Sequence, residues 1–460
     1  MSAVDTTIVN VALYRLSHDF HSTVTQIQWV VTGYTLSLAA VIPISGWATR
    51  RFGAKNVYLT AVVLFTAGSA LCGLATSSTE LIVFRVLQGV GGGLILPVGQ
   101  LMTAQAAGPK RMGRVMSVVL VPAVLAPALG PTIGGLIIQS TSWRWIFFVN
   151  LPIGLIALIA AVRTLPRSEP APADRLDFVG LALMAAGLPL LTYGLAEIGE
   201  AGTFASSKVI VPCLIGLVLV VAFVRHALRT PRPLLQMHLY RRPTFAAASV
   251  AMFCQGGALF GGMILLPLYW QTVRHFSVIH TGLLLIPQGF GAGLAMPITG
   301  RLTERYGGGP MALFGVLLMT AATIPLALVG ANTPVPWLLV VVTFRGFGVG
   351  AALMPAMTAA FASLRRSELS DATPQLNVLQ RVGASIGTAV LAVVLQRALA
   401  GAHTAPAEAS AFGIAFWAAA GLSAIAIVPC TVLLIAERRA RAARLVHEAP
   451  DPTALVEAIA

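Results

Sequence analysis

The stretch PISGWATRRFG (Pro43–Gly53) recurs 254 residues later as PITGRLTERYG (Pro297–Gly307). Farther along, FRVLQGVGGG (Phe84–Gly93) recurs more loosely as FRGFGVGAAL (Phe344–Leu353), 260 residues later. Two matches in the same order indicate that the chain contains duplicated halves. Eight apolar runs separate equivalent positions, which predicts a six-helix unit repeated with two helices inserted between the copies.

The composition around the repeat is that of a membrane protein. The 460 residues are 57% hydrophobic and 10% charged, whereas soluble domains are about 45–50% apolar and about 25% charged. Apolar runs of about twenty residues, long enough to cross a hydrocarbon core of roughly 30 Å as a helix, recur along the chain. They predict an all-α polytopic membrane protein of fourteen spans, the first of them short: 1–14, 27–48, 56–75, 80–104, 114–139, 146–165, 178–197, 208–227, 245–272, 280–300, 311–331, 336–361, 378–398 and 411–436.

The net charge of +14 raises the question of a nucleic-acid partner. If the chain starts inside and crosses fourteen times, 23 of the 30 Lys and Arg side chains lie in inner loops and the tail. Arg85 and Arg345 then lie in the membrane, and five residues lie outside: Arg15, Arg144, Lys208, Arg274 and Arg397. This positive-inside distribution predicts a multi-pass protein of the cell membrane with both termini in the cytoplasm. It assigns the charge to topology in a lipid bilayer, not to nucleic-acid binding.

Polar segments divide the chain into four parts. Residues 166–177 are rich in proline, and residues 228–243 are basic and contain further prolines. We therefore expect a six-helix bundle over 1–165, linkers with two inserted helices over 166–243, a second six-helix bundle over 244–436 and a cytoplasmic tail over 437–460. In duplicated bundles of this kind the substrate path lies at the interface between the halves.

A series of motifs resembles the fourteen-helix drug:proton antiporter branch of the major facilitator superfamily. In chain order they are VDTTIVNVAL (Val4–Leu13), GWATRRFGAK (Gly46–Lys55), RVLQGVGGG (Arg85–Gly93), PALGPTIGG (Pro127–Gly135) and SWRWIFFVNLPIG (Ser142–Gly154). Singly these are moderate signals, and in this order they are strong. The resemblance implies the major facilitator fold and a multidrug efflux transporter that works by alternating access.

Two charged residues of these motifs lie within apolar runs. A carboxylate such as Asp5 is costly in a membrane if it is charged and isolated, and one that gains and loses a proton can act as a coupling element. The resemblance implies proton coupling by Asp5 and Arg85. Two alternatives stay open: Asp5 as a helix N-cap, and Arg85 as a donor to carbonyls in a helix break. For Arg345, the repeat mate of Arg85, a structural role is favoured.

GWATRRFGAK is expected to be a short basic loop that latches the halves on the cytoplasmic side. The family pattern is Gly-x-x-x-Asp-Arg-x-Gly, but this chain has Arg50 at the acidic position, and only the second copy keeps an acid, Glu304. We therefore assign more of the latch to Glu304 with Arg305. The predicted gating residues are Gly46, Arg50, Arg51, Gly53, Glu304 and Arg305.

PALGPTIGG is expected to form a tightly packed hinge. Gly130 and Gly134 have the GxxxG spacing that lets helices approach closely, and Gly135 follows them. Pro127 and Pro131 remove backbone donors and should bend the helix. That this motif marks exporters is implied by the resemblance only.

A cavity for a drug-sized amphiphile needs an apolar, aromatic lining with a few polar groups. The side chains expected to point inward are Asn10, Gln26, Trp29, Tyr34, Gln255, Tyr269, Trp270, Gln271 and Gln288. The predicted helices of the second half carry no acidic residue, so we expect neutral, zwitterionic or monocationic substrates.

No catalytic cluster, metal-ligand spacing or phosphate-binding loop accompanies the motifs, so we expect no enzyme activity, no metal and no cofactor, with the proton gradient as driving force. The leading hypothesis is proton-coupled antiport that exports amphiphilic drugs, by a chain that functions as a monomer. The alternative is export of a dedicated endogenous metabolite, such as a lipid, siderophore or antibiotic. Because the run 1–14 is short for a span, we also expect the true start upstream of Met1; a genuine Met1 would leave Asp5 at a water-wet mouth.

Overall fold

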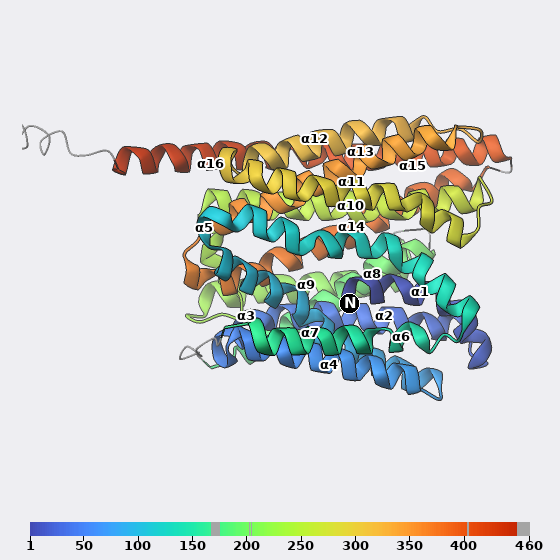
Figure 1. The fold of residues 1–460 in the computed structure, drawn as a ribbon, viewed down its shortest axis with the longest axis horizontal. Coiled ribbons are helices and arrows are strands. Elements are labelled where there is room, and N and C mark those ends of the chain that lie inside the picture. Colours follow the sequence, from blue (N-terminus) through green and yellow to red (C-terminus); the bar gives the residue numbers. More distant parts are fainter. Residues whose placement is uncertain (167–174, 202, 204, 403, 449–460) are drawn as a thin grey trace, which may run out of the picture.

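The computed structural model describes residues 1–166, 175–201, 203, 205–402 and 404–448. Within these ranges every regular element is a helix, and the helices run side by side as one elongated bundle (Figure 1). The prediction of an all-α chain is confirmed for the residues described.

Twelve helical segments of the described residues are long and apolar enough to cross a membrane. Neither α1 (Ser2–Asp19) nor the part of α5 (Ser78–Ser140) after Gly108 is among the twelve. The twelve confirm a multi-span membrane protein, whereas the predicted count of fourteen is not confirmed. The first helix, predicted over 1–14, extends in the structure to Asp19.

The first group of helices holds the chain up to Thr164. Around α1 and α5 it contains α2 (Val24–Val41), the 3₁₀ turn η1 (Ile42–Ile44), α3 (Ser45–Phe52), α4 (Ala54–Leu74), α6 (Trp145–Phe148) and α7 (Asn150–Thr164). The backbone of α5 leaves helical geometry at Gly108, where φ is 64°. Glycine adopts a positive φ at little steric cost, so α5 consists of two helices that meet at this residue.

The second group begins after the turn η2 (Met237–Arg241). It contains α10 (Pro243–Thr272), α11 (Val278–Tyr306), α12 (Gly308–Ala327), α13 (Val335–Ala362), η3 (Arg366–Glu368), α14 (Leu369–Leu399), α15 (Ala405–Ile425) and α16 (Ile427–Glu448). α16 extends beyond the end of the bundle (Figure 1). The residues expected to form a tail therefore begin as a helix, and 449–460 lie outside the described residues.

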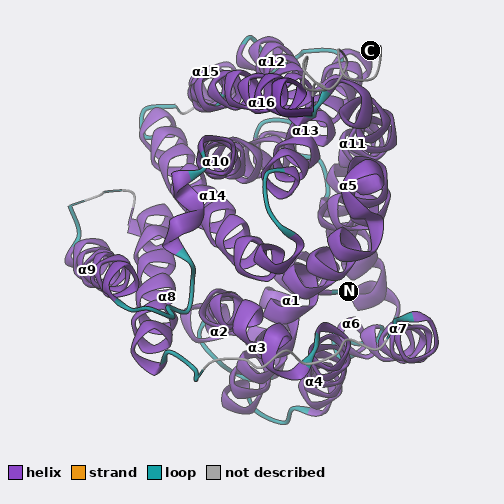
Figure 2. Cartoon of the chain, turned by 90° about the vertical axis from the view of Figure 1, so that its left-hand side faces the viewer, coloured by secondary structure: helices purple, strands orange, loops and turns teal. Residues whose placement is uncertain are grey.

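Two helices, α8 (Phe178–Ala201) and α9 (Ser207–Arg229), separate the groups in sequence. α8 packs against α2 of the first group and α14 of the second, and Figure 2 shows α9 on its outer side. Met184 and Leu188 of α8 share one apolar cluster with Ala39 of α2 and Val378 of α14. The predicted linker 166–177 falls mostly on residues outside the described part, and the division of the chain at 165, 243 and 436 stays a prediction.

The repeated motif is more helical than the sequence suggested. The segment predicted as a basic loop is the helix α3 followed by a one-residue turn at Gly53, with φ 80°. Its second copy is the end of α11 followed by a one-residue turn at Gly307, with φ 104°. A positive φ lets the chain reverse at a single glycine, so the residues on either side remain helical.

We call the end of the bundle that holds Gly53, Gly108 and Gly307 the basic end. Here side chains on both sides of Gly108, such as Leu101 and Met112 of α5, pack with α10, α13 and α14 in the largest apolar cluster. Because α5 belongs to the first group and the other three helices to the second, this cluster joins the groups. The two halves are therefore closely packed at the basic end.

Candidate functional site

A buried ion pair lies inside the first group of helices. Asp5 of α1 is 1% exposed and Arg85 of α5 is 0% exposed. Arg85 Nη1 donates to Asp5 Oδ2 at 2.5 Å. The structure thus places both predicted coupling residues together, and it places Asp5 in the protein interior instead of at a water-wet mouth.

Two amides complete the surroundings of the carboxylate. Gln88 Nε2 and Asn150 Nδ2 donate to Asp5 Oδ1 at 3.1 and 3.0 Å. Asn150 also donates to Ser69 Oγ at 3.1 Å, and Ser69 in turn donates to the carbonyl of Phe147 at 2.9 Å. The carboxylate of Asp5 therefore receives hydrogen bonds from three side chains on α5 and α7.

The guanidinium of Arg85 is held on several sides. Its Nε donates to the carbonyl of Val30 at 3.1 Å, and its Nη1 also donates to Gln88 Oε1 at 2.8 Å. Its Cζ lies 4.0 Å from the centre of the Tyr34 ring. Tyr34, predicted as a cavity residue, is 0% exposed and serves here as the aromatic neighbour of the arginine.

Gln88 and Asn150 were not predicted as site residues. Gln88 lies three residues after Arg85, so both project from the same face of α5. Asn150 stands in an apolar context within SWRWIFFVNLPIG. An amide residue within an apolar run, close to a charged residue, is a signal that the sequence alone offers. An unpaired amide in an apolar interior costs free energy, so such a residue is expected to have a polar partner.

The repeat mate Arg345, of α13, has a different environment. It is 1% exposed, and its Nε donates to Thr323 Oγ1 at 3.3 Å. Its Nη1 has no hydrogen-bond partner, and no carboxylate pairs with it among the described residues. Both halves therefore bury an arginine, but among the described residues only the arginine of the first half is paired with a carboxylate.

The first copy of the repeated motif contacts the opposite half at the basic end. Arg50 of α3 forms an ion pair with Asp371 of α14, and its Nη1 also donates to Ser370 Oγ at 3.4 Å. A Cβ added at Gly46 would overlap the carbonyl oxygen of Ser370, so the two helices touch at this glycine. We call this contact between α3 and α14 the Arg50–Asp371 latch.

The latch corrects the expectation that the helices of the second half lack acidic residues. The predicted span began at 378, whereas α14 begins at Leu369 and therefore contains Asp371. Residues 369–378 are all buried. Packing against the first half extends the helix beyond the length that a membrane span alone requires.

The second copy of the motif contacts the first half through an acidic side chain, whereas the first copy uses a basic one. Glu304 Oε1 of α11 accepts a hydrogen bond from the backbone N–H of Arg114 in α5, at 3.2 Å. One turn away, Gly113 and Gly300 approach so closely that a Cβ on either would lie 2.7 Å from the other's carbonyl oxygen. Arg51 and Arg305, the other two predicted gating side chains, are exposed.

The glycines of the predicted hinge are contact points. Gly130 and Gly134 face Thr7 and Ile8 of α1, with no room for a side chain. A Cβ at Gly135 would lie 3.4 Å from Ile279 of α11, in the other half. Both Pro127 and Pro131 lie in α5, and their side chains are outside the described part; the break in α5 is at Gly108.

The predicted cavity residues of the first half do not share one wall. Asn10 and Gln26 are exposed, and Gln26 Nε2 donates to Ser78 Oγ at 3.0 Å. The indole of Trp29 is 41% exposed and stacks on Tyr193 of α8 with ring centres 5.7 Å apart. Trp29 thus faces the inserted helices.

The predicted cavity residues of the second half lie mainly within that half. Gln255 donates to Cys430 Sγ at 3.4 Å, and Tyr269 Oη donates to the carbonyl of Gly330 at 2.8 Å. Trp270 is fully buried in an apolar cluster, whereas Gln271 is half-buried and Gln288 is 9% exposed. Gln255 Nε2 and Tyr269 Oη therefore bond within their own half, whereas Gln255 Oε1 is buried without a hydrogen-bond partner.

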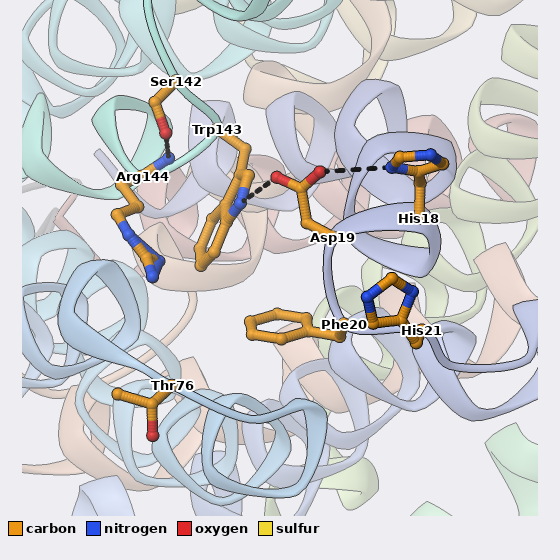
Figure 3. Close-up of a pocket in the computed structure, with 8 residues that line it drawn as sticks. All are labelled: His18, Asp19, Phe20, His21, Thr76, Ser142, Trp143 and Arg144. Atoms are coloured by element: carbon orange, nitrogen blue, oxygen red, sulfur yellow. Dashed lines mark hydrogen bonds and ion pairs between the residues drawn. The ribbon is translucent and has the colours of Figure 1, made fainter.

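A polar surface cavity of about 460 Å³ lies at the end of the bundle opposite the basic end. Asp19 accepts a hydrogen bond from Trp143 Nε1 at 3.1 Å and faces His18, as Figure 3 shows. Arg144 lies 4.4 Å from the Trp143 ring and donates to the carbonyl of Ala75. Among the described residues no three His, Cys, Asp or Glu side chains gather to hold a metal ion.

Known proteins share both sequence and fold with this chain. It is 42% identical to the "Multidrug resistance protein B homolog" of Mycobacterium tuberculosis over 398 residues, 86% of this chain and 74% of that protein. It is 31% identical to the "Putative multidrug resistance protein MdtD" of Escherichia fergusonii over 401 residues, 86% of this chain and 83% of that protein.

Two solved structures share the fold. The human organic anion transporter MFSD10 has a TM-score of 0.64 at 15% identity, covering 94% of this chain and 96% of that one. The proton:xylose symporter XylE has a TM-score of 0.61 at 15% identity, covering 93% and 91%. The family model of the Major Facilitator Superfamily matches residues 1–388. With that match and relatives above 30% identity over most of their length, the chain belongs to the Major Facilitator Superfamily of membrane transporters.

Proposed function

We propose that the chain is a proton-coupled secondary antiporter that exports amphiphilic small molecules from the cell by alternating access. The observation that carries the proposal is the buried pair of Asp5 and Arg85. Burying a titratable carboxylate inside a membrane transporter costs free energy, and the fold itself does not need this group. A carboxylate in such a position is therefore assigned a function. The names of the relatives, multidrug resistance proteins, support the substrate class.

The geometry supports a coupling role in the following way. A charged Asp5 neutralises Arg85 and accepts two amide hydrogen bonds, which holds α1 against α5 and α7. A proton on Asp5 removes the charge that holds this network together. Exposure of Asp5 first to one side of the membrane and then to the other would carry that proton inward, while substrate moves outward along the interface between the halves.

The contacts at the basic end supply the second element of alternating access. The Arg50–Asp371 latch, the hydrogen bond from Arg114 N–H to Glu304 and the packed cluster around Gly108 all join the two halves there. We assign this end to the cytoplasm by the positive-inside rule. The conformation described is then one that is closed toward the cytoplasm.

The proposal also includes the number of spans, the side of the termini, the oligomeric state and the driving force. α1 and the part of α5 after Gly108 complete fourteen spans, in two six-helix bundles with α8 and α9 inserted. Both termini then lie in the cytoplasm, and the chain functions as a monomer of the fourteen-helix drug:proton antiporter branch. The proton gradient is the driving force.

A susceptibility panel in a host that lacks its own efflux pumps tests the function. Expression of the wild-type chain should raise the inhibitory concentration of some amphiphilic drugs, and Asp5→Asn should return it to that of the empty vector at equal protein level in the membrane. Resistance that persists in Asp5→Asn would remove the proton role from this residue.

A further inference from the structure

The interior of the bundle has an uneven charge balance. Asp5 neutralises Arg85, and Asp371 neutralises Arg50. Two further arginines of the second half, Arg345 and Arg381, form no ion pair with any described carboxylate. The sequence count of charges in the membrane had included Arg345 but missed Arg381, which lies twelve residues inside α14.

Arg381 lies on the face of α14 that meets the first half. Asn377, one helical turn earlier on the same face, donates to Gln100 Oε1 of α5 at 2.7 Å. Arg381 is also close enough to Tyr34 of α2 for an electrostatic interaction between them. Since Tyr34 covers Arg85, Arg381 is a neighbour of the Asp5 site across the interface between the halves.

The burial of α14 changes at this position. Residues 369–378 are all buried, whereas residues 379–382 are each partly exposed. The packed contact at the basic end therefore ends one turn before Arg381. The Arg381 residue is partly exposed and makes no hydrogen bond or ion pair with a described residue.

The repeat explains why the second half lacks a counter-charge. Arg345 corresponds to Arg85 at an offset of 260, and Thr323 corresponds to Ser69 at an offset of 254. A Cβ added at Gly262 of α10 would overlap the guanidinium of Arg345, so α10 presents a glycine to this arginine where α1 presents Asp5 to Arg85. The second copy of the charged site is built without its carboxylate.

An arginine stays protonated in proteins, and an isolated one in a membrane interior is costly. A carboxylate or sulfonate is its natural partner, because two parallel N–H groups of the guanidinium can bond two oxygens of the anion. We propose that Arg381 binds the acidic group of the transported molecule, so that the substrates are amphiphilic organic anions, with Arg345 adding to the positive field. This rests on the proposed transport function and replaces the expectation of neutral, zwitterionic or monocationic substrates.

The charge of such a substrate has a consequence for energetics. For a one-to-one exchange, a proton that enters and an anion that leaves both move with a membrane potential that is negative inside. Both charge movements then add to the driving force for export. Export of the anion should therefore respond to the membrane potential as well as to the pH gradient.

A matched pair of probes tests the proposal. Anilinonaphthalene sulfonate carries a permanent negative charge, and phenylnaphthylamine is the same aromatic body without the sulfonate. Equilibrium binding of each radiolabelled probe to the purified, immobilised transporter should favour the sulfonate. Arg381→Gln should weaken sulfonate binding at least about tenfold, while Arg381→Lys keeps most of it and phenylnaphthylamine binding stays within about twofold.

Arg397→Gln is the matched control, because it removes the same charge from an exposed position near the end of the same helix. The sulfonate should bind this control as it binds the wild type. Equal affinity for both probes, or equal losses in Arg381→Gln and Arg397→Gln, would overturn the anion site. Uptake into inside-out vesicles distinguishes the anion site from the wider transport function. Export of ethidium that Arg381→Gln leaves intact contradicts the anion preference only. Selective sulfonate binding without uptake of any probe contradicts transport.

Discussion

Breaking the Arg50–Asp371 latch should open the basic end of the bundle. The side chains of Arg50 and Asp371 are 28% and 11% exposed, so the pair is neither a free surface pair nor a fully buried one. Surface pairs contribute about 0–1 kcal/mol, and removing one partner of a buried pair costs about 3–5 kcal/mol. We therefore expect Arg50→Ala to destabilise the closed state by about 1–3 kcal/mol, a shift of roughly 5- to 150-fold in the equilibrium between closed and open.

The assay is a distance measurement between two spin labels at the basic end. Asn56 at the start of α4 and Arg438 of α16 are exposed and belong to opposite halves. Labelled cysteines at these positions, with the four native cysteines replaced by alanine, report the separation of the halves by pulsed electron paramagnetic resonance. Arg50→Ala should add a population at longer distance.

A charge exchange distinguishes the latch from general damage. Arg50→Asp combined with Asp371→Arg restores an ion pair with reversed polarity and should return the distances toward those of the wild type. Arg51→Ala, which removes a neighbouring exposed arginine, should change nothing. The reasoning is refuted if Arg50→Ala leaves the distances unchanged, or if the exchanged variant is as open as the two single variants combined.

Two further predictions concern glycines at helix contacts. Gly46→Ala places a methyl group against the carbonyl of Ser370 and should open the basic end in the same distance assay, whereas Gly99→Ala, with 3.6 Å to its nearest neighbour, should not. Gly130→Ala places a methyl group onto Thr7 Oγ1 and should cost about 1–3 kcal/mol of stability; a lower melting temperature that Thr7→Ala restores would support this, and an unchanged one would count against a close approach there.

The sequence predicted the elements that depend on local pattern and repetition. Long apolar runs and the duplicated motif predict a multi-span helical bundle, and the family resemblance singled out Asp5 and Arg85, which the structure brings into contact. Gln88, which was not predicted as a site residue, lies three residues after Arg85 in the same motif. These features are readable because each is determined by residues close together in the chain.

The features that the sequence did not predict depend on contacts between distant segments. Asp371 was placed outside a helix because hydropathy measures the membrane span alone, whereas α14 begins earlier through packing against the first half. Gln255 and Tyr269, predicted as cavity residues, form hydrogen bonds with Cys430 of α16 and with Gly330 after α12, contacts that the sequence did not indicate. Polar residues in an apolar run do not reveal which neighbouring helix they face.

The central claim, proton coupling at the Asp5 and Arg85 pair, is tested most directly by proton movement in reconstituted liposomes. An outward gradient of a transported amphiphile, imposed without a pH gradient, should drive protons in the opposite direction, as reported by a trapped pH-sensitive dye. Asp5→Asn should abolish this proton flux while probe binding to the purified variant persists. Proton flux that is unchanged in Asp5→Asn, or that runs with the substrate, would contradict the account.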